Sequence, residues 1–194
     1  MVYYIKLGAT LFIIAAIASG VLAFVNSFTK PIIEENQRQA EIAARQEVLP
    51  EADTFEHIEA ALPYYKGYDE QGELIGYTFV AVGAGYSGDI QTMVGLTKDY
   101  NIRNITVISQ TETPGLGANV TRRDFLDQYK DRSLDELVLD VDTGDIEIIT
   151  GATITARTLN SSVKEASHQV IEQIEQGARE EDTDITTQDY EEAA

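Results

Sequence analysis

A run of about 22 residues without a charge, Leu7–Phe28, most constrains what this chain can fold into. As a helix it would be about 33 Å long, and the hydrocarbon core of a bilayer is about 30 Å thick. Tyr3, Tyr4 and Lys6 precede the run, and Lys30 follows it. Aromatic and basic residues are typical of membrane interfaces. We therefore predict a transmembrane helix over residues 7–29, after a short segment 1–6. The alternative is a cleaved signal peptide, whose apolar region is normally shorter, about 7–15 residues.

The charge and the cysteine count exclude several classes of function. The chain has 33 acidic and 14 basic residues, a net charge of −19, and no cysteine. Nucleic-acid binding needs clustered Lys and Arg, so no nucleic-acid partner is expected. Disulfides, iron–sulfur clusters and thiolate metal sites all need cysteine. His57 and His168 are too far apart in sequence to form a metal-ligand spacing, so no metal site is predicted.

The remaining residues predict an α+β fold, with one domain that has a mixed or antiparallel sheet and flanking helices. Residues 30–60 read as a membrane-proximal segment, with a helix over 31–49 that Pro50 ends. Residues 61–177 form the domain, and the acidic residues 178–194 are expected to be disordered. β-Branched and aromatic runs predict strands at 65–68, 74–82, 90–97, 102–109, 137–141 and 146–149. Helices are predicted at 121–132, capped by Thr121, and at 156–176, stopped by Gly177.

The first motif with chemical content is Thr150-Gly151-Ala152-Thr153-Ile154-Thr155, placed between a short β-branched segment and the last helix. The start of a helix presents free N–H groups and the positive end of the helix dipole, which stabilise a phosphate. Gly151 and Ala152 allow a bulky ligand to approach the backbone. Taken by itself, the motif favours the alternative, a threonine-rich helix cap that binds no ligand.

The second motif, Thr111-Glu112-Thr113-Pro114-Gly115-Leu116-Gly117, directly follows a predicted strand. Pro114-Gly115 predicts a tight turn, because proline fixes φ and glycine supplies a positive φ. A rigid loop of this kind can lay Leu116 and the backbone against a flat ring. The alternative is a plain turn with one exposed leucine.

Together the two motifs resemble the FMN-binding domain of the G subunit of Rnf complexes, which are ion-translocating ferredoxin:NAD oxidoreductases. The C subunit of the sodium-translocating NADH:quinone oxidoreductase is a more distant resemblance. The similarity spans nearly the whole chain: one N-terminal span, a proline near residue 50, the loop Gly85-Tyr86-Ser87-Gly88, and the two motifs in this order.

The resemblance implies FMN bound covalently, through a phosphoester to Thr153. A separate flavin transferase would install it with FAD as donor. The family has an acidic residue, usually Asp, six positions before the acceptor, and here Glu147 stands there. Glu112, Thr113 and Leu116 would contact the ring and Thr155 the phosphate. The cofactor-binding set is completed by Thr150, Gly151, Ala152 and Gly117. No catalytic residue is expected, because FMN carries the chemistry.

The resemblance also implies a redox subunit without a complete activity of its own. Its partners would be other membrane and iron–sulfur subunits of the same complex, the flavin transferase and membrane lipid. The expected location is the cell (inner or cytoplasmic) membrane, with one span and the soluble domain on the extracytoplasmic side. Two alternatives stay open at this point: a membrane-anchored extracellular flavin reductase, and a membrane-tethered binding module without redox chemistry.

Overall fold

The computed structural model describes the backbone of residues 2–192 and the side chains of residues 3–179. The chain divides into two compact units, Met1–Ala40 and Glu41–Ala194, which are described separately. The first unit is a single helix, most of α1 (Val2–Val48). Of the described helices, α1 alone is long and apolar enough to cross a membrane. The single N-terminal apolar helix is thereby confirmed.

Helix α1 does not break where the sequence suggested a boundary. The chain stays helical through Pro31 and ends at Val48, just before Pro50. The ring of proline fixes a φ that a helix accepts, but Pro31 removes one helix hydrogen bond and its ring crowds the carbonyl of the residue four positions earlier. On the surface, the pairs Lys30–Glu34 and Glu35–Arg38 add contacts one turn apart.

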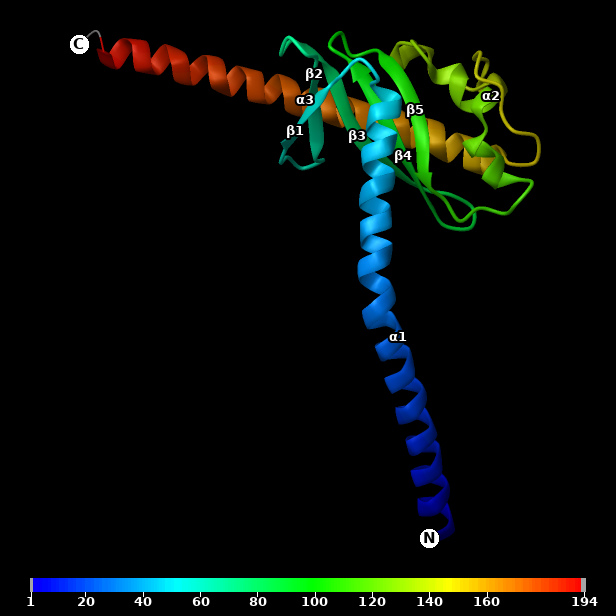
Figure 1. Ribbon diagram of the computed structural model, residues 1–194. Helices are drawn as coiled ribbons and strands as arrows, with labels where there is room; N and C mark the ends of the chain where they lie inside the picture. Colours follow the sequence, from blue (N-terminus) through cyan, green and yellow to red (C-terminus); the bar gives the residue numbers. More distant parts are fainter. Residues whose placement is uncertain (1, 193–194) are drawn as a thin grey trace. The chain divides into compact units, whose positions relative to one another are not determined.

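The second unit is built on a five-stranded antiparallel sheet in the order β1-β2-β3-β4-β5 (Figure 1). The strands are β1 (Thr54–Ile58), β2 (Tyr64–Tyr68), β3 (Leu74–Ala84), β4 (Asp89–Thr97) and β5 (Ile102–Ser109). The predicted strands from β2 to β5 are confirmed, and each pairs with its neighbour along the chain. β1 was missed because its sequence, TFEHI, is short and half polar.

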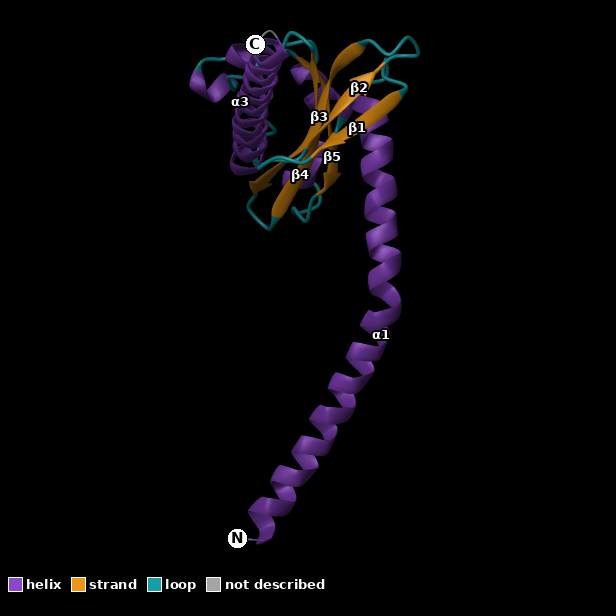
Figure 2. Cartoon of the chain, turned by 90° about the vertical axis from the view of Figure 1, so that its left-hand side faces the viewer, coloured by secondary structure: helices purple, strands orange, loops and turns teal. Residues whose placement is uncertain are grey.

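Successive side chains of a strand point to opposite faces of the sheet, and the two faces pack against different helices. Phe79 and Ala81 lie in the main core with Leu159 and Val163 of α3 (Thr153–Glu192). Figure 2 shows α3 running along one side of the sheet. On the other face, Met93 packs against Ala44 and Val48, at the end of α1.

Between β5 and α3 the structure corrects the sequence prediction. In place of a helix over 121–132 there is α2 (Arg123–Leu126), flanked by the 3-10 helices η1 (Gly117–Thr121) and η2 (Asp127–Tyr129). Thr121 does not cap α2, since its hydroxyl donates to the Ala118 carbonyl oxygen.

The strands predicted at 137–141 and 146–149 are wrong. The structure has η3 (Leu134–Glu136), η4 (Asp140–Asp142) and one parallel bridge, Leu139 to Ile146. Thr143 has a φ of 69°, and the N–H of Gly144 donates to the Leu139 carbonyl oxygen. This turn leaves no length for a ladder, although Leu137, Leu139 and Ile146 are buried as strand residues would be.

The last helix begins earlier and ends later than predicted. It starts at Thr153, three residues before Ala156, and its backbone is helical to Glu192 instead of stopping at Gly177. Gly177 does not have a positive φ, so it does not take the left-handed conformation that ends many helices. Residues 193–194 of the predicted disordered tail lie outside the described residues.

One buried hydroxyl yields a stability prediction. Tyr129 is fully buried, and its Oη has no hydrogen-bond partner among the described residues. Burial also raises the pKa of its phenol. We expect Tyr129→Phe to raise the free energy of unfolding by about 1 kcal/mol, because it removes an unpaired polar atom. Chemical denaturation of the full chain in mild detergent measures this. Tyr68→Phe is the control, since it removes a hydrogen bond to Glu56 at 2.9 Å and should not stabilise. A loss of stability in Tyr129→Phe would contradict the prediction.

Candidate functional site

The start of α3 is shaped by a turn that leaves backbone donors free. Gly151 has a φ of 79°, and the Ala152 N–H donates to the Ile149 carbonyl oxygen at 2.9 Å. The chain then enters the helix at Thr153, and the N–H groups of its first turn have no partner within the helix. These groups and the helix dipole favour an anion at this position.

The second motif forms a compact loop next to the helix start. The N–H groups of Leu116 and Ala118 both donate to the Thr113 carbonyl oxygen, at 3.1 and 3.2 Å. Gly115 has a φ of 79°, as the Pro-Gly turn predicts. Leu116 is 47% exposed. The loop therefore presents an apolar side chain at its tip.

The two motifs, far apart in sequence, line one cavity of about 450 Å³. Eight of the nine predicted cofactor-binding residues lie on its wall: Glu112, Thr113, Leu116, Gly117, Gly151, Ala152, Thr153 and Thr155. The ninth, Thr150, is exposed and lines a separate cavity of about 570 Å³, together with Arg122 and Glu147. The structure thus brings eight of the predicted residues together and separates Thr150 from them.

Glu112 joins three segments of the cavity wall. It is only 6% exposed. One carboxylate oxygen accepts the N–H of Ser87 at 2.7 Å, and the other accepts the hydroxyl of Thr155 at 2.7 Å. Burial raises the pKa of Glu112, but the hydrogen bonds from Ser87, Thr155 and two neighbouring backbone N–H groups together outweigh it and hold this pKa below its ordinary value. Glu112 is therefore an ionised carboxylate, bound from two sides.

Two glycines leave room for this carboxylate. A Cβ on Gly85 would lie 2.5 Å from the Glu112 Oε1, and one on Gly117 would lie 2.3 Å from its Oε2. Both distances are shorter than any side chain tolerates. The close approach of the Glu112 carboxylate therefore requires glycine at positions 85 and 117.

The predicted attachment residue is free to react. Thr153 is half-buried, and its hydroxyl has no hydrogen-bond partner among the side chains that the structure describes. Its neighbour Thr155 is buried and bonded to Glu112. Of the two threonines in the first turn of α3, Thr153 alone offers a hydroxyl to a ligand.

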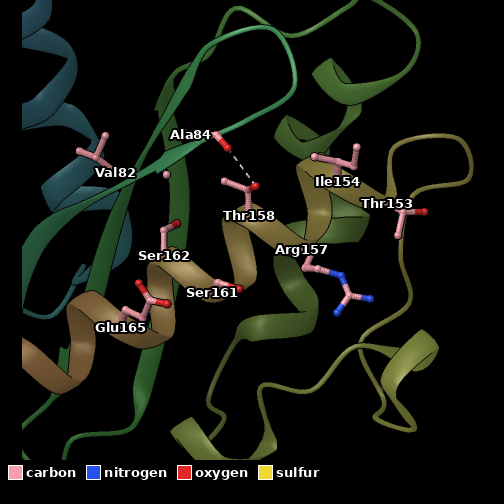
Figure 3. Close-up of a pocket in the computed structure, with 10 residues that line it drawn as sticks. Val82, Ala84, Thr153, Ile154, Arg157, Thr158, Ser161, Ser162 and Glu165 are labelled. Atoms are coloured by element: carbon pink, nitrogen blue, oxygen red, sulfur yellow. Dashed lines mark hydrogen bonds between the residues drawn. The ribbon is translucent and has the colours of Figure 1, made fainter.

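Thr153 also borders a groove of about 460 Å³ on its other side, between the end of β3 and α3 (Figure 3). Arg157, one turn after Thr153, lines this groove and forms an ion pair with Asp142 at 2.7 Å. The hydroxyl of Thr158 donates to the Ala84 carbonyl oxygen at 3.1 Å, which fixes the helix to the strand end. Thr153 and Ile154 lie between the two hollows.

Three contributors to the site were not predicted. Tyr86 and Ile154 line the cavity with Thr153 and are 74% and 57% exposed. Ser87 contributes its backbone N–H to Glu112. The glycine-rich loop at 85–88 was visible in the sequence, but its pairing with Glu112 depends on a backbone atom, which carries no sequence signal.

The crowding at Gly117 gives a direct test of this packing. Gly117→Ala places a methyl group against the Glu112 carboxylate and 2.8 Å from the Thr155 Oγ1. We expect a loss of about 1–3 kcal/mol in the free energy of unfolding, as for other overpacked sites. Denaturant unfolding of the full chain measures it. Gly8→Ala, where nothing lies within 4 Å, is the control and should not destabilise. Equal stability of Gly117→Ala and the natural protein would contradict the geometry.

Two family models match the chain. The model described as FMN-binding domain matches residues 85–168, which include the loop 85–88, the Glu112 loop and the start of α3. The model described as RnfG N-terminal region matches residues 4–48, which lie in α1. Both the cavity and the apolar helix therefore fall inside matched segments.

Two relatives match this chain over most of their length. The G subunit of the Na⁺-translocating ferredoxin:NAD⁺ oxidoreductase complex of Acetobacterium woodii is 38% identical over 183 residues, covering 81% of this chain and 87% of that protein. The G subunit of the proton-translocating ferredoxin:NAD⁺ oxidoreductase complex of Clostridium ljungdahlii is 33% identical, covering 77% and 82%.

Among solved structures, the C subunit of the Na⁺-translocating NADH-quinone reductase from Parabacteroides distasonis has a similar fold. The TM-score is 0.52 at 16% identity, covering 68% of this chain and 90% of that one. The segment matched by the FMN-binding model contains every residue that lines the cavity. The chain belongs to the family of G subunits of Rnf-type ion-translocating oxidoreductase complexes, and it contains their FMN-binding domain.

Proposed function

We propose that this chain carries FMN as a phosphoester on the Thr153 hydroxyl and relays electrons within a membrane-bound ion-translocating ferredoxin:NAD oxidoreductase. The observation that carries the proposal is the position of Thr153. Its unpartnered hydroxyl lies at the start of α3, on the wall of a cavity built by both motifs.

The residues present fit such a cofactor. The free N–H groups at the start of α3 suit the ester phosphate, which keeps a negative charge. Tyr86, Leu116 and Ile154 are exposed apolar side chains around the cavity and suit a flat aromatic ring. Glu112 is already bonded to Ser87 and Thr155, so its role is to hold the wall in place.

Attachment of FMN to Thr153 would be a phosphoryl transfer from FAD. The Thr153 Oγ forms a bond to the phosphorus on the FMN side of FAD, the bond to the AMP oxygen breaks, and the hydroxyl proton leaves. The flavin transferase would supply the base for this step. The charge that the family places six residues before the acceptor is carried here by Glu147, in the neighbouring cavity with Thr150.

When bound, FMN accepts and donates electrons one or two at a time. The chain would bind and orient it, and helix α1 would anchor it in the cell membrane, with the domain on the extracytoplasmic side. Its partners would be the other membrane and iron–sulfur subunits. One of the two relatives is a subunit of a Na⁺-translocating complex and the other of a proton-translocating complex.

The experiment is an anaerobic reductive titration of the full chain, produced together with a flavin transferase and purified in mild detergent. We expect flavin absorbance that bleaches on reduction and returns on reoxidation, at one flavin for each chain. A colourless protein would overturn the proposal and favour a membrane-tethered module without redox chemistry. Flavin that resists reversible reduction would overturn the electron-carrier role.

A further inference from the structure

A further cavity, of about 310 Å³, lies between residues 41–45 of α1, the β1–β2 hairpin and the face of β3 and β4 that α1 covers. Its walls are mainly apolar: Leu62, Pro63, Phe79, Val80, Val82 and Met93. This volume is at the lower end of the range for small-molecule sites. None of the flavin-site residues lines it.

Arg45 reaches this apolar cavity as a buried cation. It is 9% exposed, and its guanidinium carbon lies 3.4 Å from the centre of the Tyr65 ring. Stacking on a ring satisfies the face of a guanidinium, while its five N–H donors lie in the plane and need acceptors. The Nε is buried without a hydrogen-bond partner among the described residues. A buried charge of this kind is costly unless an anion pairs with it.

Arg45 is buried without a paired carboxylate in a chain in which 33 acidic residues outnumber 14 basic ones. Within the described side chains, ion pairs are formed by the arginines at 38, 103, 122, 123, 157 and 179. Glu41 lines the same cavity one turn before Arg45, yet no ion pair joins these two described side chains. The cavity therefore offers a cation whose partner is not supplied by the described part of the fold.

We propose that this cavity binds a small organic carboxylate, with its carboxylate on the edge of the Arg45 guanidinium and its apolar body against Val80 and Met93. A planar carboxylate matches the fork of N–H donors that a guanidinium presents. The apolar walls exclude water, which strengthens that pairing and disfavours an inorganic ion. His57, which stacks on Tyr65 at 4.7 Å, lies at the exposed side of the cavity.

The chain has a built-in reporter for this site. It contains two methionines, Met1 and Met93, and Met93 is 1% exposed on the cavity wall. We would label the methionine methyl groups with ¹³C in the full chain and titrate it with 3-phenylpropionate. The expected result is a saturable shift of the Met93 resonance and no shift of Met1. The neutral 3-phenylpropanamide, with the same ring, should bind at least about tenfold more weakly, because it lacks the charge.

Two variants separate the proposal from a purely structural role of Arg45. Arg45→Gln should weaken 3-phenylpropionate binding about tenfold or more and leave the amide unaffected, while Arg38→Gln, earlier on the same helix, should change neither. If Arg45→Gln does not fold, Val82→Glu places a competing carboxylate at a rim position that is 56% exposed, and should have the same effect. Equal binding of acid and amide, unchanged binding in both variants, or no saturable shift of Met93 would each overturn the proposal.

Discussion

Thr153→Ala is expected to abolish covalent flavin while leaving the domain folded. The substitution removes the one hydroxyl that the first turn of α3 offers to the cavity, since the Thr155 hydroxyl is bonded to Glu112. The side chain of Thr153 makes no hydrogen bond with the described residues, so its loss should cost less than about 1 kcal/mol of stability. Flavin fluorescence in a denaturing gel measures the attachment, because only covalent flavin stays with the chain.

Neighbouring threonines provide matched controls for this experiment. Thr150→Ala alters a residue of the same motif that lines the other cavity, and Thr158→Ala alters one turn further along α3. Both variants should keep the fluorescent band. Thr150 belongs to the family's acceptor pattern, so Thr150→Ala is expected to give a weaker band than Thr158→Ala. Thr153→Ser keeps a hydroxyl and should keep part of the label. A band of full intensity in Thr153→Ala would contradict the assignment.

Glu112→Ala is expected to cause the largest loss of stability, about 3 kcal/mol or more in the free energy of unfolding. The substitution leaves the N–H of Ser87 and the buried hydroxyl of Thr155 without their acceptor, and it opens a hole between Gly85 and Gly117. Because the carboxylate ties together the loops around the cavity, flavin loading should fall as well. Denaturant unfolding and gel fluorescence measure the two effects. Glu165→Ala, an exposed position on α3, is the control and should change stability by less than about 0.5 kcal/mol.

The same carboxylate predicts a pH dependence. The pKa of Glu112 in the folded protein lies below its ordinary value of 4.5. The stabilisation from its ionised form is therefore fully present above pH 4.5 and is lost as the pH falls through the lower, folded-state pKa. The difference in unfolding free energy between the natural protein and Glu112→Gln should be constant near neutral pH and shrink in acid. A difference that stays constant down to the lowest accessible pH would contradict an ionised Glu112.

Much of this site was predictable, because glycine, proline and β-branched residues have strong local conformational preferences. Pro114-Gly115 predicts the turn, and β-branched alternation predicts the strands β3, β4 and β5 that position the loops. The start of α3 was predicted three residues late, because Gly151 sets it through a positive φ that no periodicity reveals. A contact of Glu112 with the ring stays a prediction, while the hydrogen bonds of its carboxylate with Ser87 and Thr155 were not predicted.

The failures have two physical causes. Residues 137–149 contain buried apolar residues at alternate positions, as a strand would, but a turn at Thr143 and Gly144 and the 3-10 helix η4 interrupt them. β1 forms because β2 offers it an edge, although the alternation of its own residues is weak. In the first case a local turn, and in the second pairing with a neighbouring strand, overrides the preference read from the apolar pattern.

The most direct test of the central claim is fragment-ion mass spectrometry of the tryptic peptide between Arg132 and Arg157, from protein produced with its flavin transferase. This peptide contains Thr143, Thr150, Thr153 and Thr155, so its fragments distinguish the candidate hydroxyls. We predict one FMN phosphoester, located on Thr153. An unmodified peptide, or the ester on any of the other three threonines, would contradict the account.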